Sequence, residues 1–194
     1  MRIRCTGGIE DDPTEEGRLI GLAQRGDRAA FGALVRRYQI DAVRLATAIT
    51  CRADEAEDAA QTAFVKAYAS LAKFDAARPF RPWLLRIVAN EAKNRRRAAG
   101  RRTRLVERIN VMYVDHEPST EDVVLAGLDA DSLVRAIAML DDRDRIVLGY
   151  RWFAQMTEAE MAMALGCAPG TVKSRLARAM QRLRIELERR SAHA

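Results

Sequence analysis

Residues 157–180 read TEAEMAMALGCAPGTVKSRLARAM, and this stretch decides both the fold and the class of function. Thr157 and Glu160 have the spacing of a capping box, in which a hydroxyl and a carboxylate satisfy the first amides of a helix. Gly166 suits the left-handed residue that ends a helix, and Pro169 suits the first turn of the next helix. The pattern predicts a helix-turn-helix, which is typical of DNA-binding proteins.

The second helix of this motif is predicted over residues 171–190. At about 100° per residue, one side carries four apolar residues: Val172, Leu176, Met180 and Leu183. We expect that side to pack and the opposite side, with Lys173, Ser174 and Arg178, to enter a major groove. A surface helix with solvated charges is the alternative, but the turn and the periodicity together favour the helix-turn-helix.

The chain of 194 residues is long enough for one large or two small domains, and we favour two. Its formal net charge is +6, and the basic residues gather in two runs. Eight lie between Lys93 and Arg108, and seven lie between Lys173 and Arg190. Nucleic acid is the polyanion that such runs favour.

Cys5, Cys51 and Cys167 lie far apart, and only His116 and His193 could join them as soft ligands. This spacing argues against a zinc site or a disulfide framework, so we predict no metal, no cofactor and no catalytic residue. Buried or incidental thiols are favoured over redox-sensing ones. Apolar runs all fall short of the roughly 18 residues of a membrane span, and the first residues lack a signal-peptide core. We therefore expect no membrane span and a cytoplasmic location.

Apolar residues recur at helical intervals over residues 15–24, 27–50, 54–74 and 81–100, and again from about residue 129. Since no segment alternates like a strand, we expect an all-α chain. Its predicted parts are a mobile tail (1–14), a helical domain (15–102), a flexible acidic linker (103–127) and a second helical domain (128–194).

A second candidate surface for nucleic acid lies on the helix predicted from residue 81. Five of its polar side chains fall within a sector of about 100°: Arg86, Asn90, Lys93, Asn94 and Arg97. Amides combined with cations suit a single strand, whose bases expose their edges. Phe80 and Trp83 could stack on bases, although a core role for Trp83 and a solvated role for the two Asn residues stay open.

The segment from Asp54 to Asp58 opens another helix with carboxylates at the positive end of the helix dipole. The face that follows is amphipathic and includes Gln61, Phe64, Val65 and Tyr68. Either an ordinary helix start or a helix that binds a partner explains this pattern.

Four motifs in order carry a resemblance over residues 15–190: GDRAAF (26–31), DEAEDAAQTAF (54–64), FRPWLLRIVAN (80–90) and GTVKSRLAR (170–178). Together they are similar to an extracytoplasmic-function sigma factor of the sigma-70 family. The resemblance implies a bacterial RNA polymerase subunit that is not an enzyme. It implies a sigma-2 domain and a sigma-4 domain without the sigma-3 domain between them.

The resemblance also implies three sets of site residues. Core polymerase would contact Asp54, Glu57, Asp58, Gln61 and Phe64. Single-stranded −10 promoter DNA would contact Phe80, Arg81, Trp83, Arg86, Asn90, Lys93, Asn94 and Arg97, with the loop from Asp75 to Phe80. Duplex −35 DNA would contact Arg151, Thr171, Lys173, Ser174, Arg175, Ala177 and Arg178. The acidic linker would enter the polymerase cleft, and an anti-sigma factor would mask both domains.

Two positions depart from the family pattern. Cys167-Ala168 stands where a Ser is common, so a capping hydrogen bond worth about 1 kcal/mol is missing. Ala177 is small, which shifts readout toward Lys173, Arg178 or duplex shape. A free-standing helix-turn-helix regulator is the main alternative, although it would need a dimerisation or effector module. A nucleic-acid-processing enzyme is disfavoured because no nucleophile–base or metal-ligand cluster stands out.

Overall fold

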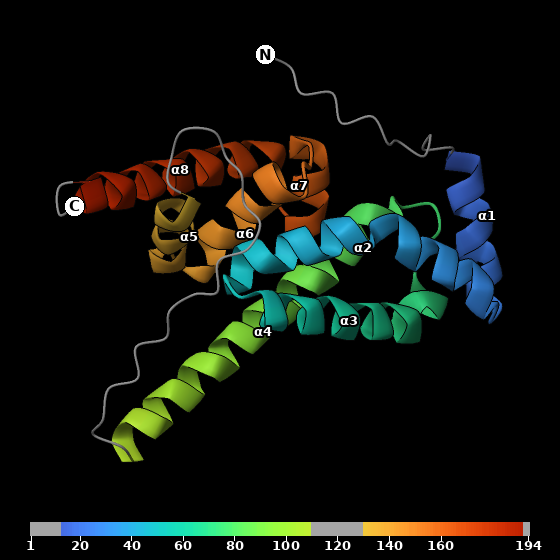
Figure 1. Cartoon of the computed structure of the whole chain (residues 1–194). Helices are drawn as coiled ribbons and strands as arrows, with labels where there is room; N and C mark the ends of the chain where they lie inside the picture. The colour runs from blue at the N-terminus through green and yellow to red at the C-terminus, as the bar shows by residue number, and fades with distance from the viewer. Residues whose placement is uncertain (1–12, 110–129, 192–194) are drawn as a thin grey trace.

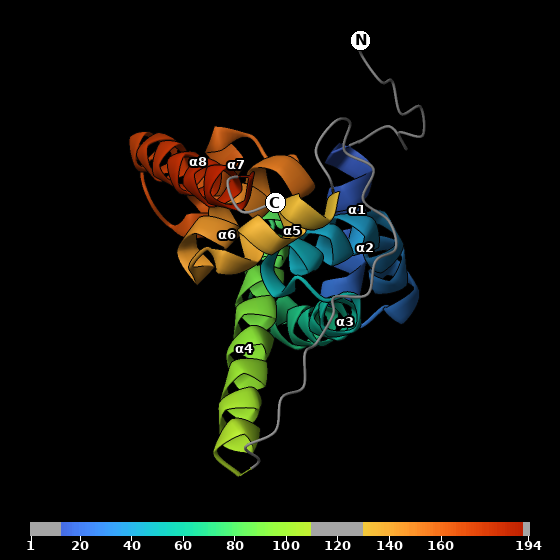
Figure 2. The same ribbon diagram turned by 60° about the vertical axis from the view of Figure 1, so that its left-hand side comes forward.

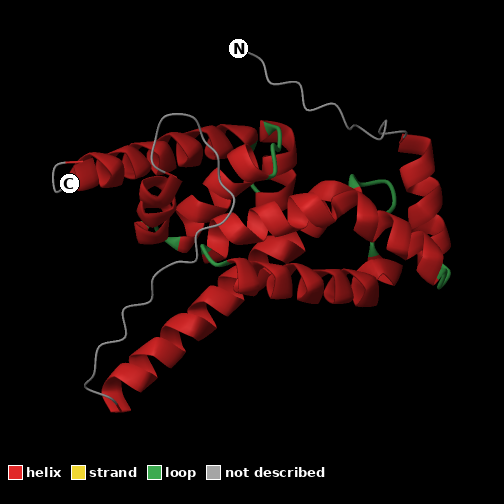
Figure 3. Cartoon of the chain, viewed as in Figure 1, coloured by secondary structure: helices red, strands yellow, loops and turns green. Residues whose placement is uncertain are grey.

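The computed structural model describes residues 13–109 and 130–191. Within these ranges every regular element is a helix (Figure 3), which confirms the all-α prediction. The predicted tail, up to residue 12, and the linker from residue 110 onward lie outside the described residues. None of the helices described is both long enough and apolar enough to cross a membrane.

The N-terminal unit contains α1 (Pro13–Gln24), α2 (Arg28–Thr50), α3 (Ala53–Ser70) and α4 (Phe80–Ile109). Helix α2 begins at Arg28 because the Asp27 side chain accepts hydrogen bonds from the amides of Ala29 and Ala30, at 2.8 and 3.1 Å. Helices α2, α3 and α4 pack against one another, and α1 packs against α2 at the end remote from the C-terminal unit (Figures 1 and 2).

Small side chains bring these helices close together. The buried face of α3 consists of alanines: Ala56, Ala59, Ala60, Ala63 and Ala67. Larger side chains from the neighbouring helices, such as Leu45 of α2 and Leu85 of α4, fill the space around this alanine face. Small and large side chains therefore interdigitate within the bundle, as in other well-packed protein interiors.

Two helix ends differ from the sequence prediction. Helix α3 ends at Ser70 and is followed by a short 3-10 helix, η1 (Leu71–Lys73), rather than continuing to residue 74. Helix α4 continues to Ile109, so residues 103–109 are helical where we expected the linker. The apolar periodicity fades there, but Arg, Leu and Glu are strong helix formers and prolong the helix. This second half of α4 extends away from the bundle (Figure 2).

The C-terminal unit contains α5 (Ala130–Met139), α6 (Asp142–Leu148), α7 (Glu158–Leu165) and α8 (Pro169–Ser191). A π-helical turn, η2 (Gly149–Phe153), follows α6 directly. Helices α7 and α8 form the predicted helix-turn-helix. The exact domain boundaries remain predictions.

The N-terminal and C-terminal units share one apolar core. A single buried cluster contains Leu45 and Ile49 of α2 and Leu85 of α4, together with Tyr150 and Met156 of the C-terminal unit. Both views show the helix-turn-helix lying against the N-terminal bundle (Figures 1 and 2). The two units are therefore in direct contact in this structure.

Candidate nucleic-acid interface

The capping box at the start of α7 is present as predicted. The Thr157 hydroxyl accepts a hydrogen bond from the Glu160 amide at 3.2 Å, and Glu160 Oε2 accepts one from the Thr157 amide at 2.8 Å. Gly166 ends α7 with a φ of 62°, in the left-handed region that glycine adopts without strain. These local contacts fix the conformation of the turn between α7 and α8, and so the orientation of α8.

Helix α8 begins at Pro169, the residue predicted for its first turn. The carbonyl of Ala168 accepts hydrogen bonds from the amides of Thr171 and Val172, at 2.9 and 3.3 Å. Since Ala168 has no polar side-chain atom, it cannot supply the cap that a serine gives.

The packed face of α8 differs from the prediction at one residue. Val172 and Ala179 are fully buried and Leu176 and Leu183 are half-buried, but Met180 is 41% exposed. Helical winding explains the difference, because Ala179 lies about 20° from Val172 around the helix axis and Met180 lies about 80° away. Ala179, not Met180, is the core residue of this turn.

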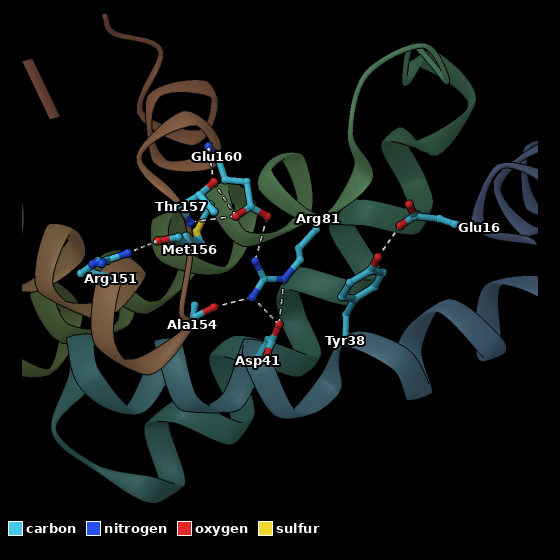
Figure 4. A network of polar contacts seen from close by, with 9 residues as sticks. All are labelled: Glu16, Tyr38, Asp41, Arg81, Arg151, Ala154, Met156, Thr157 and Glu160. Atoms are coloured by element: carbon cyan, nitrogen blue, oxygen red, sulfur yellow. Dashed lines mark hydrogen bonds and ion pairs between the residues drawn. The ribbon is translucent and has the colours of Figure 1, made fainter. Parts of the chain in front are cut away.

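The opposite face of α8 is open to solvent. Lys173, Ser174, Arg175, Ala177 and Arg178 are exposed, and Thr171 is half-buried. Arg178 donates to the Ser174 carbonyl within the same helix, at 3.1 Å. Arg151, also in the predicted −35 set, is exposed in η2 and donates to the Met156 carbonyl at 3.3 Å (Figure 4).

The polar sector predicted on α4 also lies at the surface. Arg86, Asn90, Asn94 and Arg97 are exposed, and Lys93 is half-buried. The structure therefore has a second surface that combines amides with cations, on a different helix and in a different unit from α8.

Phe80 does not share that surface. It is 1% exposed, and the rings of Tyr38, Phe74 and Trp83 surround it with centroids 5.3–5.7 Å away. Trp83 is half-buried against Phe74, at 4.6 Å between centroids. The geometry thus favours the core role for both residues, and the expectation that Phe80 stands ready to stack on a base is not met in this structure.

Arg81 forms a polar network that sequence reasoning missed (Figure 4). Its Nε and Nη2 atoms donate to Asp41 Oδ2 of α2 at 2.9 and 2.8 Å, and Nη1 donates to Glu160 Oε1 of α7 at 2.9 Å. Nη2 also contacts the Ala154 carbonyl. These partners are remote from Arg81 in the sequence, so the residues around Arg81 do not predict these contacts.

Arg97, another predicted −10 residue, pairs with the C-terminal unit. Asp142 of α6 accepts from Arg96 Nε at 2.7 Å and from Arg97 Nε at 2.9 Å. Burial by itself would raise the pKa of Asp142, but the hydrogen bonds from the two arginines outweigh burial and lower that pKa. The carboxylate is therefore stabilised in its charged form.

The predicted polymerase-binding residues lie along α3. Asp54, Glu57 and Gln61 are exposed, and Asp58 is exposed but pairs with Arg95 at 2.7 Å. Phe64 packs inward against the buried clusters instead of facing solvent. The large apolar side chains exposed on this helix are Val65, at 69%, and Tyr68, at 38%. At 100° per residue, Phe64 lies about 40° from Ala60 of the alanine face, whereas Val65 lies about 140° from it.

The described cysteines fit a structural role. Cys51 and Cys167 are both free and half-buried. Burial raises the pKa of the Cys51 thiol despite the nearby Arg145 guanidinium, 3.6 Å from the sulfur. The described residues contain no cluster of three or more His, Cys, Asp and Glu side chains that could bind a metal.

Known families match both units. Sigma-70 region 2 matches residues 34–102, and Sigma-70 region 4 matches residues 130–183. The chain belongs to the sigma-70 family. This sigma factor is thus a transcription initiation factor and not an enzyme.

Curated relatives place the sigma factor among those of the extracytoplasmic-function type. It is 34% identical to RNA polymerase sigma-H factor of Pseudomonas aeruginosa, over 86% of this chain and 91% of that protein. It is 31% identical to ECF RNA polymerase sigma-E factor of Escherichia coli, over 84% and 89%.

A solved structure resembles the sigma factor over most of its length. It is the complex of the sigma factor RpoE with the anti-sigma factor NepR from Bartonella quintana. The likeness has a TM-score of 0.59 and 26% identity, and it covers 80% of this chain and 97% of that one.

Proposed function

We propose that this sigma factor binds core RNA polymerase in the cytoplasm and directs it to promoters by contacting DNA at two separated places. One observation carries this proposal: a single chain exposes two basic surfaces on two helical units, and one of these belongs to a helix-turn-helix. A protein that only reads duplex DNA needs just one such surface.

The exposed face of α8 reads the duplex −35 element. Lys173, Ser174 and Arg178 lie in its first three turns, the part of a recognition helix that meets base edges. Arginine and lysine supply phosphate contacts and bonds to guanine, whereas Ala177 offers only a methyl group. Specificity for the −35 sequence therefore rests on Lys173 and Arg178.

The exposed sector of α4 binds the opened −10 strand. Asn90 and Asn94 offer both donors and acceptors to base edges, while Arg86 and Lys93 neutralise phosphates. Because Phe80 is buried and Arg81 is engaged with Asp41 and Glu160, base contact in this arrangement falls to the amide-bearing side chains.

The exposed face of α3 binds core polymerase. Asp54, Glu57 and Gln61 give it a polar, acidic character, and Val65 adds apolar area beside them. Phe64 supports this face from the inside by packing against the core. An acidic face with exposed apolar side chains beside it suits a basic helical partner surface.

We also propose that an anti-sigma factor controls this protein. The solved sigma factor from Bartonella quintana is bound to the anti-sigma factor NepR, and this chain resembles it over most of its length. Such a partner would cover polymerase-binding or DNA-binding surfaces until a signal releases it.

Transcription in vitro with purified core polymerase tests the proposal. The protein should give promoter-dependent start sites on a pool of genomic templates, and the same polymerase without it should not. The absence of any protein-dependent start site would contradict the proposal. A matched variant, Asn90→Ala/Asn94→Ala, should lose promoter opening while retaining core binding, whereas Gln39→Ala, exposed on α2, should retain both.

A further inference from the structure

The side chain of Gln24 in α1 binds the backbone of η1. Its Nε2 atom donates to the Leu71 carbonyl at 3.1 Å and to the Phe74 carbonyl at 2.8 Å, although 47 and 50 residues separate these partners from Gln24 in the sequence. A side-chain amide has two N–H donors, so one glutamine can serve both carbonyls. Gln24 therefore joins α1 to the short helix that ends just before the loop of residues 75–79.

Phe74 is the residue at which the chain leaves η1. Its amide still donates to the Leu71 carbonyl at 3.0 Å, but its own backbone is extended, with a φ of −73° and a ψ of 130°. Phe74 is buried, and buried backbone carbonyls need a hydrogen-bond partner, which Gln24 supplies. By binding the carbonyls before and after this bend, Gln24 fixes the direction in which the loop begins.

Helix α1 also supports the loop through apolar contacts. Ile20 and Ala23 are 3% and 4% exposed, and they belong to the same buried cluster as Phe74 and Phe80, which lie at the two ends of the loop. The rings of Phe74 and Phe80 meet edge to face, with centroids 5.6 Å apart. Helix α1 lies beside this end of the bundle (Figure 1), so it completes the core on which both ends of the loop rest.

The loop itself is ordered by local hydrogen bonds. Asp75 Oδ1 accepts from the Ala77 amide at 3.0 Å, and the Asp75 carbonyl accepts from the Arg78 amide at 2.9 Å. This is the way in which aspartate stabilises turns. All five loop residues are exposed, so the buried ends of the loop determine where the turn lies relative to α4.

The loop leads directly into the helix that carries the proposed strand-binding sector. Asn90 lies ten residues beyond Phe80, which is about 15 Å along α4. This distance equals the rise of about four stacked nucleotides, so one opened strand can contact the loop and the sector together. Groups that recognise a ligand must be held within about 0.5 Å of their working positions. The placement of the loop therefore matters for the choice of bases.

We propose that Gln24 is a positioning residue for recognition of the −10 strand. Its two hydrogen bonds hold the loop of residues 75–79 in register with the exposed sector of α4, and this register contributes to the preference for the −10 sequence. Gln24 lies outside residues 34–102, the segment that matches Sigma-70 region 2. The inference rests on the proposed function.

Hydrogen exchange in the isolated protein tests whether Gln24 orders the loop. Gln24→Met keeps the length of the side chain but removes both donors. The amides of Phe74, Ala77 and Arg78 are hydrogen-bonded, so a peptide spanning residues 71–80 reports their protection by mass spectrometry. Their exchange should become about 2- to 10-fold faster, as expected for the loss of one or two hydrogen bonds. Unchanged exchange would overturn the proposal.

The matched control for stability is Ile20→Val. It removes one methylene group from the same buried cluster and leaves both hydrogen bonds of Gln24 in place, at a cost comparable to that of one lost hydrogen bond. Exchange in the loop should stay close to that of the wild type. Equal acceleration in the two variants would show that the packing of α1, not the Gln24 amide, orders the loop.

Binding of single-stranded DNA by the assembled holoenzyme tests the consequence for recognition. The probes are a labelled oligonucleotide with the −10 element of a promoter found in vitro and the same oligonucleotide with that element scrambled. Gln24→Met should reduce the ratio of the two affinities by about 2- to 10-fold. Ile20→Val, and Gln39→Met at an exposed position on α2, should keep the wild-type ratio. Affinity for core polymerase should be the same in all four proteins.

A simple loss of stability would lower both affinities together and leave their ratio unchanged. A wild-type ratio in Gln24→Met, or an equal loss in Ile20→Val, would therefore overturn the positioning role. If the wild-type holoenzyme itself does not prefer the −10 oligonucleotide, the proposed function fails instead. The exchange experiment separates these two failures, because it needs neither polymerase nor DNA.

Discussion

Arg81 Nη1 in α4 lies 2.9 Å from Glu160 Oε1 in α7, although 79 residues separate them in the sequence. The Glu160 carboxylate has two roles. Oε1 binds Arg81, and Oε2 caps α7 by accepting hydrogen bonds from the Thr157 amide and hydroxyl. Burial alone would raise the pKa of Glu160, but its bonds to Thr157 and Arg81 lower it below the usual value. One side chain therefore joins local helix capping to the contact between the two units.

Arg81→Gln should lower the free energy of unfolding by about 1–3 kcal/mol, because it leaves the half-buried carboxylates of Asp41 and Glu160 without their cation. Urea denaturation followed by circular dichroism measures this change. Arg78→Gln is the matched control, since Arg78 is 78% exposed and pairs with the exposed Asp75. A loss no larger than that of the control would show that the Arg81 network contributes nothing to stability.

The ion pairs between the units predict a pH dependence. The pKa values of Asp142 and Glu160 are lowered from 3.8 and 4.5, so their stabilisation is fully present above those values and is lost as the pH falls through the lowered values. The stability difference between wild type and Glu160→Gln/Asp142→Asn should be largest above about pH 5 and shrink toward pH 2. Urea titrations across this range measure it, and a difference independent of pH would contradict the assignment.

Gly166→Ala should destabilise the protein by about 1 kcal/mol, because alanine resists the left-handed conformation at the end of α7. A Cβ at Gly166 would meet nothing within 4 Å, so the expected cost is purely conformational. Gly170→Ala is the control: Gly170 also has open space around it but lies in the first turn of α8, where alanine is favoured. If both variants lose the same stability, the left-handed turn is not the cause.

Lys173→Ala/Arg178→Ala should weaken binding to the duplex −35 element. The slope of log affinity against log salt concentration should become shallower by the amount expected for the loss of about two phosphate contacts. Affinity for core polymerase should stay unchanged, since the proposed polymerase-binding face lies on α3. Fluorescence anisotropy with labelled duplex, measured on the assembled holoenzyme, reports the change. Arg184→Ala/Arg189→Ala, further along α8, should have a smaller effect, and loss of core binding by the first variant would refute this division of labour.

Local patterns in the sequence were sufficient to predict the helix-turn-helix. The capping box at Thr157, the left-handed Gly166 and Pro169 at the start of α8 depend on neighbours within a few residues, and all three are confirmed. The exposed sector of α4 was predictable for the same reason. Helical periodicity requires only the order of residues along one helix.

Contacts between remote segments escaped prediction. Nothing near Arg81 or Arg97 in the sequence indicates that Glu160 and Asp142 bind them, so both arginines were assigned to DNA alone. Phe80 was misplaced because its burial depends on Tyr38 and Phe74, which other elements supply. The end of α4 was misjudged because helix propensity, rather than apolar periodicity, extends the helix.

Promoter binding with and without core polymerase tests the central claim most directly. The measurement is the mobility shift of a promoter fragment, chosen from the start sites found in vitro, against a fragment with both elements scrambled. We predict that the isolated sigma factor does not distinguish the two fragments, and that the protein with core polymerase selects the promoter. Selective binding by the isolated chain would contradict the account and would identify it as a free-standing regulator.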